Sequence, residues 1–227
     1  MAELTIFIGN KAYSSWSLRA WLALEHVSRS GALAAPYKEV ILPLAPPGTR
    51  TVAARAHSPS GKVPALQDGD LVVWDSLAIC EYLADAFPSA KLWPDDRAVR
   101  AIARSVSAEM HSGFPALRSH MTMNVRRDPI VLPLTPEASD DVARVQALWA
   151  DCRTRFGKGG PFLFGRFSVA DAMFAPVATR FHTYGVPLDD GSRAYVDAVY
   201  AMPEMQKWIA GAKQETWTID VYEKVGK

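Results

Sequence analysis

The feature that most constrains the fold is an abrupt change of pattern near residue 87. Before this point, strand-like and helix-like segments alternate along the chain. After it, the strand patterns stop and helical spacing of apolar residues continues to about residue 212. The segment between them, FPSAKLWPDD at 87–96, carries two prolines and few strong helix formers, so it is predicted to be a connector. The pattern predicts an α/β part followed by an all-α part.

The first part alternates strands with helices. Apolar residues recur at every second position in 4–8, which predicts a strand that ends at Gly9-Asn10. A helix is expected at 17–28, a strand at 37–42 and a weak helix at 50–56. The turn Asp68-Gly69-Asp70 predicts a hairpin between 65–66 and 71–74, and a helix is expected at 75–87.

The second part is predicted to be helical throughout. Helices are expected at 97–123, 139–156, 169–181 and 193–212, with proline-rich or glycine-rich breaks at 129–136, 157–161 and 185–191. Ser168 stands three residues before Asp171 and precedes an apolar run, which predicts a capping box. We expect this box to stabilise its helix and to take no part in catalysis.

Charge and composition exclude several classes of protein. The 25 Lys and Arg residues nearly balance the 24 Asp and Glu residues, so no strong field is available to hold nucleic acid or an acidic membrane surface. No apolar run is long enough to span a membrane and no signal-peptide pattern opens the chain, so a cytoplasmic location is expected. Cys80 and Cys152 are predicted to be buried thiols, and no metal site is expected.

Three motifs carry a family resemblance, namely SSWSLR at 14–19, GKVPAL at 61–66 followed by DSLAICEYL at 75–83, and FSVADAMFAPV at 167–177. Together they make the chain resemble the cytosolic glutathione S-transferase superfamily. The first motif is similar to the serine signature of the zeta class, the maleylacetoacetate isomerases, and of related bacterial members. The resemblance implies a thioredoxin-like glutathione-binding domain at 1–86 and a helical-bundle domain at 95–227.

The middle motif is expected to hold glutathione. A proline that opens a central strand is awkward unless the Val63-Pro64 bond is cis. The resemblance implies that Val63 and the adjacent Lys62 face glutathione. It also implies that Ser76 holds the γ-glutamyl carboxylate at a helix N-terminus, where unpaired N–H groups favour an anion, and that Asp75 pairs with the ammonium group. Simple helix capping is the alternative role for Asp75 and Ser76.

The first motif offers hydroxyls that could stabilise a thiolate. A free thiol has a pKa of about 8.5, and one hydrogen bond to a charged acceptor, about 1.5 to 3 kcal/mol, would lower it by one or two units. Alignment with the zeta signature favours Ser14, which we place first, whereas spacing back from Arg19 favours Ser15. Tyr13 is a rival donor, and capping of the helix is the alternative role for either serine.

For several neighbouring residues the sequence allows more than one role. Trp16 replaces the zeta-class cysteine, which argues against the isomerase activity of that class, and it could form an aromatic wall or simply pack. Arg19 could support the active-site loop or lie on the helix surface. His111, Phe114 and Arg118 fall on the helix that lines the electrophile pocket in relatives.

The resulting hypothesis is a glutathione-dependent transferase that attacks a small hydrophobic electrophile. Glutathione is the co-substrate, no other cofactor is required, and a homodimer is implied by the resemblance. Two alternatives keep the same fold: a glutathione-dependent isomerase or peroxidase, and a non-catalytic ligand-binding protein.

Overall fold

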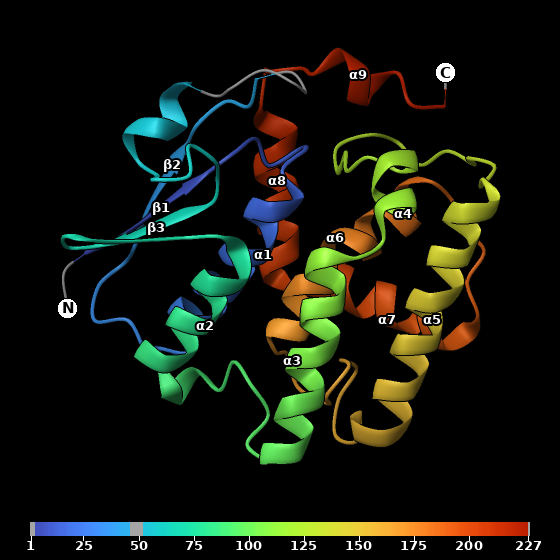
Figure 1. The fold of residues 1–227 in the computed structure, drawn as a ribbon, viewed down its shortest axis with the longest axis horizontal. Helices are drawn as coiled ribbons and strands as arrows, with labels where there is room; N and C mark the ends of the chain where they lie inside the picture. Colours follow the sequence, from blue (N-terminus) through green and yellow to red (C-terminus); the bar gives the residue numbers. More distant parts are fainter. Residues whose placement is uncertain (1–2, 46–51, 227) are drawn as a thin grey trace.

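The computed structural model describes residues 3–45 and 52–226. Its N-terminal part is a four-stranded sheet with two helices (Figure 1). The elements are β1 (Leu4–Ile8), α1 (Ser15–Arg29), β2 (Lys38–Ile41), the 3-10 helix η1 (Val52–Ala56), β3 (Ala65–Asp68), β4 (Leu71–Trp74) and α2 (Ser76–Ala86). The strand order is β2-β1-β3-β4, with β1 parallel to β2 and the other pairs antiparallel. The predicted α/β part, with its hairpin, is confirmed.

Strand β1 lies inside the sheet and is covered on both faces. Ile6 and Ile8 are buried in the main core, whereas Phe7 points to the other face and packs with Leu42 and Ala65. Side chains of a strand alternate between its two faces, so a central strand of this kind must be apolar at nearly every position. This explains why 4–8 reads almost as a continuous apolar run.

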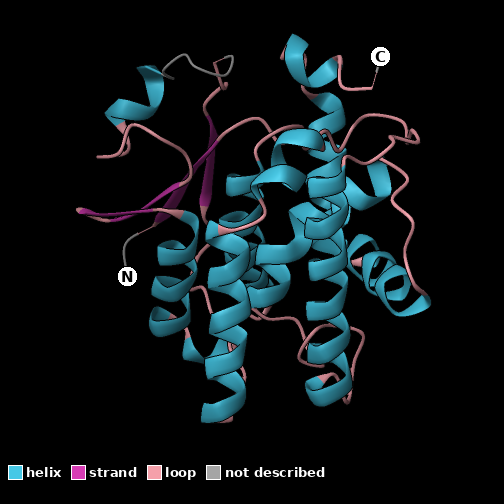
Figure 2. Cartoon of the chain, turned by 45° about the vertical axis from the view of Figure 1, so that its right-hand side comes forward, coloured by secondary structure: helices cyan, strands magenta, loops and turns pink. Residues whose placement is uncertain are grey.

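The C-terminal part is built of helices, drawn in cyan in Figure 2. They are α3 (Arg97–Ser112), α4 (Pro115–His120), α5 (Pro136–Phe156), α6 (Val169–Thr183), α7 (Asp190–Ala201), α8 (Pro203–Gln214) and α9 (Asp220–Glu223). None of the described helices is both long enough and apolar enough to cross a membrane. The predicted all-α part is confirmed.

Helix α6 joins the two parts into one core. It is buried along almost its whole length and contacts α1 of the N-terminal part as well as α3 and α7. The capping box predicted from Ser168 and Asp171 is present at its start. Because α6 is buried on all sides and mostly apolar, it is stable only where other elements surround it.

Two predicted helices are each divided by a proline. The helix expected at 97–123 ends at Ser112 and restarts at Pro115, with Phe114 between them at a φ of 63°. The helix expected at 193–212 is likewise two helices, because Met202 takes an extended conformation before Pro203. A proline disfavours the helical conformation of the preceding residue and lacks the N–H that would continue a helix. Both single-helix predictions were therefore wrong.

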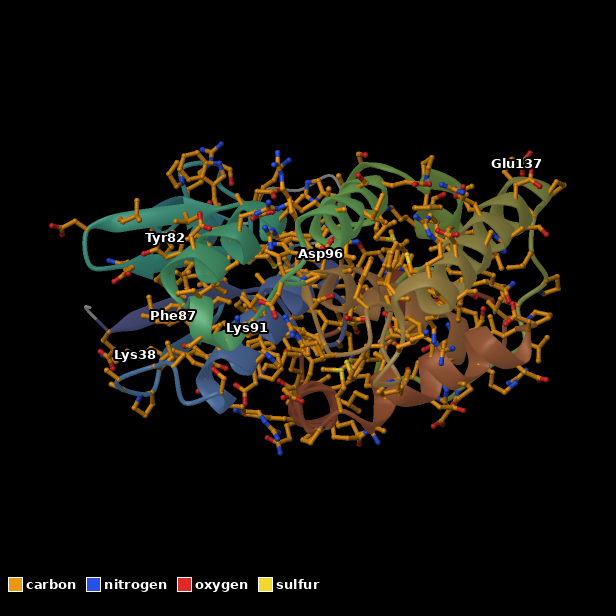
Figure 3. All side chains as sticks on the ribbon, turned by 90° about the horizontal axis from the view of Figure 1, so that it is seen from below. Lys38, Tyr82, Phe87, Lys91, Asp96 and Glu137 are labelled. Atoms are coloured by element: carbon orange, nitrogen blue, oxygen red, sulfur yellow. The ribbon has the colours of Figure 1, made fainter. Side chains whose placement is uncertain are left out.

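The connector runs between the two parts and contains the short 3-10 helix η2 (Pro88–Ala90). In Figure 3, Lys91 and Asp96 lie between Lys38 of β2 and Tyr82 of α2 on one side and Glu137, at the start of α5, on the other. Asp96 caps α3 by accepting two amide N–H bonds. Helix α3 thus begins directly after Asp96, at the end of the connector. The domain boundaries at 86 and 95 stay predictions.

Both cysteines are buried and unpaired by disulfides, as predicted. Burial raises the pKa of the Cys80 thiol to about 12, and burial likewise raises that of Cys152 to about 12. A thiol that stays protonated is a poor nucleophile. These two residues therefore serve as small apolar side chains.

Candidate active site

The N-terminus of α1 carries the two candidate serines, and their hydroxyls differ. Ser14 is the N-cap, and its Oγ accepts the backbone N–H of Ser17 at 3.3 Å. The same hydroxyl donates to Ser17 Oγ at 2.7 Å, and Ser17 Oγ accepts the Gly9 N–H at 2.9 Å. The Ser14 hydroxyl is thus held by partners that fix the entry into the helix.

Ser15 is the first residue of α1, and it lines a cavity between the two parts of the molecule. Its hydroxyl has no hydrogen-bond partner within residues 3–45 and 52–226. The residue is only 7% exposed, and the cavity is the side from which its hydroxyl can be reached. A free hydroxyl donor at a helix N-terminus is well placed to meet an anion in the cavity.

Tyr13, the alternative donor, has a hydroxyl that already makes hydrogen bonds within the protein. Its phenol donates to the Glu223 carboxylate of α9 and accepts from Arg126 and from the Ile219 N–H. Burial, followed by the hydrogen bond to Glu223, raises the pKa of Tyr13 to about 12. The Tyr13 hydroxyl therefore links the start of the chain to its C-terminal segment and is not free to serve a thiolate.

The loop before β3 presents backbone groups to the same cavity. The Val63-Pro64 peptide bond is cis, and both Lys62 and Val63 line the cavity. The N–H and C=O groups of Val63 make no hydrogen bond to any other described residue. Since backbone polar groups in a protein are nearly always paired, this edge can bind an extended peptide-like ligand.

The start of α2 has a strained cap and an unpaired hydroxyl. Asp75 has a φ of 74°, and its Oδ1 accepts the N–H groups of Leu77 at 2.9 Å and Ala78 at 3.3 Å. Its Oδ2 lies 3.2 Å from Nε2 of His111 on α3. Ser76 is buried, yet its Oγ has no hydrogen-bond partner in the part of the chain that the structure describes. A buried polar atom without a partner is uncommon in native proteins and is a reason to look for a ligand.

Trp16 contacts both the cavity and His111, the residue that pairs with Asp75 at the start of α2. Its ring packs edge-on against His111 at 5.1 Å between centroids, and it also lines the cavity. Behind it, the Arg19 guanidinium lies 4.5 Å from the ring centre and is fully buried, so the surface alternative for Arg19 was wrong. Burial holds the pKa of Arg19 well below its usual range, and the neighbouring Arg118 adds to this effect.

The cavity has a volume of about 700 Å³, which suits a small-molecule site. It brings together four of the predicted site residues, Ser14, Ser15, Lys62 and Val63. Pro64, Asp75 and Ser76 do not line it. The remaining lining residues come from both parts of the molecule and are Tyr13, Trp16, Leu44, Arg55, Ser60, Gly61, Arg118, Thr122, Met123, Arg180 and Tyr222.

The charged side chains of the cavity are all basic among the residues that the structure describes. They are Arg55, Lys62, Arg118 and Arg180. Sequence reasoning named Arg118 and Lys62 but missed Arg180. A signal was available, because Arg180 is the single charged residue in the apolar run from Ala172 to Phe181. A lone charge inside a buried helix often has a specific partner or ligand.

Comparison with known families gives two matches that lie in chain order. Residues 13–86 match the family described as glutathione S-transferase, N-terminal domain, and residues 135–211 match glutathione S-transferase, C-terminal domain. Between them these matches cover more than half of the chain and include all three sequence motifs.

Individual relatives agree with the family matches. The chain is 26% identical over 164 residues to glutathione S-transferase Z2 of Arabidopsis thaliana, covering 70% of this chain and 73% of that protein. It is 28% identical over 191 residues to glutathione S-transferase T1 of the same plant, covering 79% and 74%.

The fold also matches that of solved transferases. A theta class enzyme from Xanthomonas axonopodis pv. citri, crystallised with glutathione bound, has a TM-score of 0.64 and 25% identity, covering 92% of this chain and 98% of that one. A transferase homologue from Burkholderia, also with bound glutathione, has a TM-score of 0.66 at 22% identity, covering 93% and 98%. From its two domain matches, these relatives and this fold, we conclude that the chain belongs to the glutathione S-transferase superfamily.

Proposed function

We propose that this protein is a glutathione transferase that binds reduced glutathione in the 700 Å³ cavity and transfers it to a small electrophile. One observation carries the proposal: the free Ser15 hydroxyl and the unpaired backbone of Val63 line the same cavity. Glutathione offers a thiol and a peptide backbone, which are the groups that these two features would bind.

The unpaired polar groups of the site fit the other parts of glutathione. Val63 would pair with the cysteinyl backbone as a short strand does, and Lys62 and Arg55 would attract a carboxylate. The orphaned Ser76 Oγ and the N-terminus of α2 suit the γ-glutamyl carboxylate. The Asp75 carboxylate is 44% exposed and is therefore available to the ammonium group of glutathione. That ammonium group would compete with His111 for Asp75.

The same site favours the ionised thiol. Ser15 Oγ–H would donate to sulfur, and the first turn of α1 adds the positive end of its dipole. A hydrogen bond to a charged acceptor contributes about 1.5 to 3 kcal/mol, which corresponds to a fall in thiol pKa of about one to two units. The thiolate then attacks the electrophile, so Ser15 stabilises the nucleophile without having to remove its proton itself.

The test compares Ser15→Ala with Ser14→Ala. We expect Ser15→Ala to raise the thiol pKa of bound glutathione, followed by thiolate ultraviolet absorbance, by about one to two units and to lower kcat/KM about 10- to 100-fold. Ser14→Ala removes a helix cap, so it should lower the free energy of unfolding by about 1 kcal/mol and leave the thiol pKa nearly unchanged.

The reverse pattern, a thiol pKa that moves in Ser14→Ala and not in Ser15→Ala, would assign the role to Ser14. If neither variant, nor the double variant, changes the thiol pKa or turnover, the serine mechanism is wrong. Product analysis separates the alternatives: a transferase consumes glutathione into a conjugate, an isomerase regenerates it and a peroxidase oxidises it. Glutathione binding without turnover of any electrophile would favour a binding protein.

We also propose that the protein is a homodimer. The edge strand β4 carries Leu71 and Trp74, which are 49% and 45% exposed. An edge strand with large apolar side chains is a surface that a second chain can cover. Light scattering should give twice the monomer mass, and Trp74→Glu should lower it, whereas a monomeric mass for the wild-type protein contradicts the proposal.

A further inference from the structure

Two arginines line the helical side of the cavity and are fixed by backbone carbonyls. Arg118 of α4 donates to the carbonyls of Gly113 and Met110. Arg180 of α6 donates from Nε to Met121 O at 2.7 Å and from Nη1 to Pro176 O at 3.0 Å. Carbonyl acceptors hold each guanidinium in place, but they carry no formal charge. These contacts therefore fix the two guanidinium groups without neutralising them.

Neither guanidinium has a carboxylate within ion-pair distance in the described part of the chain. Nη1 of Arg118 and Nη2 of Arg180 make no hydrogen bond to any residue described there. Arg180 is only 5% exposed. A buried charge without a partner is costly, so this arrangement is stabilised most by an anion in the cavity.

Six other arginines of the described residues form ion pairs. Arg118 and Arg180 form none, as the buried Arg19 forms none, and of these three Arg118 and Arg180 line the cavity. Arg126, near the same end of the molecule, pairs with Glu223 at 3.1 Å, and Arg144 pairs with Glu109 at 2.7 Å. Burial, with the neighbouring Arg118, lowers the pKa of Arg180 to about 9, so it is still protonated at neutral pH. The cavity thus contains two fixed positive charges without an ion-pair partner among the described residues, although Asp141 attracts Arg118 from beyond ion-pair distance.

An aromatic surface lies beside these charges. The Arg118 guanidinium is 5.1 Å from the centre of the Trp16 ring, and Trp16 itself lines the cavity. The indole ring can stack on a flat ligand while the guanidinium binds a charged substituent of that ligand. The sequence led us to expect a purely hydrophobic electrophile, and the basic lining argues for a different class.

We propose that the electrophile of this enzyme carries a carboxylate, which Arg118 and Arg180 bind while its apolar body contacts Trp16. This inference rests on the proposed transferase function. With an aryl chloride, for example, the thiolate sulfur forms a bond to the ring carbon and the carbon–chlorine bond breaks. Chloride leaves with the bonding electrons, and the carboxylate is unchanged by the reaction.

The test uses a matched pair of electrophiles, a chlorodinitrobenzoate and the corresponding chlorodinitrobenzamide, each corrected for its rate without enzyme. We expect kcat/KM for the benzoate to exceed that for the benzamide by about 10-fold or more. Arg118→Met should raise KM for the benzoate about 10-fold and leave KM for the benzamide and for glutathione nearly unchanged. Arg180→Lys should also raise KM for the benzoate, but by less, because lysine keeps the positive charge and lacks the paired N–H donors of the guanidinium.

The matched control is Arg155→Met, since Arg155 is an exposed arginine that pairs with Asp151 and lies outside the cavity lining. It should leave the preference for the benzoate unchanged. Arg180→Lys and Arg118→Met are chosen because complete removal of the buried Arg180 side chain could prevent folding, and thermal unfolding checks each variant.

Three results would overturn the inference while the transferase function stands. One is equal turnover of benzoate and benzamide by the wild-type enzyme, and another is an equal effect of Arg118→Met on both. The third is a rise in KM for glutathione in place of the benzoate, which would assign the arginines to a glutathione carboxylate.

If no electrophile is turned over, the proposed function fails, and binding of the benzoate, followed by tryptophan fluorescence, decides the inference. Weaker binding in Arg118→Met, with unchanged binding in Arg155→Met, supports the carboxylate site. Equal binding by all three proteins overturns it.

Discussion

Two helix N-termini of this molecule carry similar residues and differ in how completely their polar atoms are paired. At α6, both oxygens of Asp171 accept hydrogen bonds, from the N–H groups of Leu163 and Ser168 and from the hydroxyls of Ser168 and Tyr195. At α2, Asp75 binds the first amides of its helix, but the buried Ser76 hydroxyl beside it has no partner.

This difference distinguishes a structural cap from a binding cap. The α6 cap is closed, because every donor around Asp171 meets an acceptor of the chain itself. The α2 cap is open, since the buried Ser76 hydroxyl has no partner among the described residues, and we propose that a ligand supplies one. The N-terminus of α1 combines both conditions in adjacent serines, where Ser14 is paired and Ser15 is free. Substitutions should therefore affect stability at the closed cap and ligand affinity at the open one.

The largest effect is expected from Asp171→Ala. It removes the acceptor of four hydrogen bonds and leaves buried donors unpaired, so the free energy of unfolding should fall by about 3 to 5 kcal/mol. Urea denaturation measures this loss. Asp151→Ala, an exposed acid of α5, is the control and should change stability by less than about 0.5 kcal/mol. A loss below about 1 kcal/mol for Asp171→Ala would mean that the cap is not closed as described.

The next effect is a pH dependence at the same residue. Burial raises the pKa of Asp171 from 3.8 to about 6, partly offset by its hydrogen bonds. Between these values the folded state binds more protons than the unfolded state. The contribution of this group is thus fully present below about pH 4 and is lost as the pH rises through about 6, a change of about 3 kcal/mol.

The measurement compares the wild-type protein with Asp171→Asn, which cannot titrate at this position. From pH 4 to pH 7, the free energy of unfolding of the wild type should fall by about 2 to 2.5 kcal/mol relative to that of the variant, which is most of the total change. Parallel pH profiles for the two proteins would contradict the expected pKa shift.

The smallest effect on stability is expected from Ser76→Ala. Its hydroxyl has no hydrogen bond to lose, so the free energy of unfolding should change by less than about 0.5 kcal/mol, whereas glutathione should bind about 10-fold more weakly. Ser107→Ala is the matched control, because Ser107 is also buried in a helix but donates to Ala103 O at 2.7 Å. It should lower stability and leave glutathione affinity unchanged, as titration calorimetry can measure. Equal affinity of wild type and Ser76→Ala would remove Ser76 from the binding site.

Much of the fold could be predicted because its signals are local. The alternation in 4–8, the Asp68-Gly69-Asp70 turn and the Ser168–Asp171 box each depend on residues close together in the chain. The helix breaks before Pro115 and Pro203 also have a local cause. They were not predicted because the helical spacing of apolar residues continues on both sides of each proline. The site was predictable in part, since its motifs named Ser15 and Val63.

The remaining features of the site depend on contacts between distant segments. The hydrogen bond from Tyr13 to Glu223 joins residues that are far apart in the chain. Arg118 and Arg180 line the same cavity only because α4 and α6 both pack around it. No pattern within a single helix reports which side chain of another helix will face it.

The sequence by itself determined the order of the elements, the change from α/β to all-α architecture and the identity of the family, because these follow from local propensity and from short motifs. Only the tertiary structure decided which serine hydroxyl is free, that Arg19 is buried, and that arginines from α4 and α6 line the cavity. Hydrogen-bond pairing and uncompensated charge are properties of groups brought together in space, and they exist only once the chain has packed.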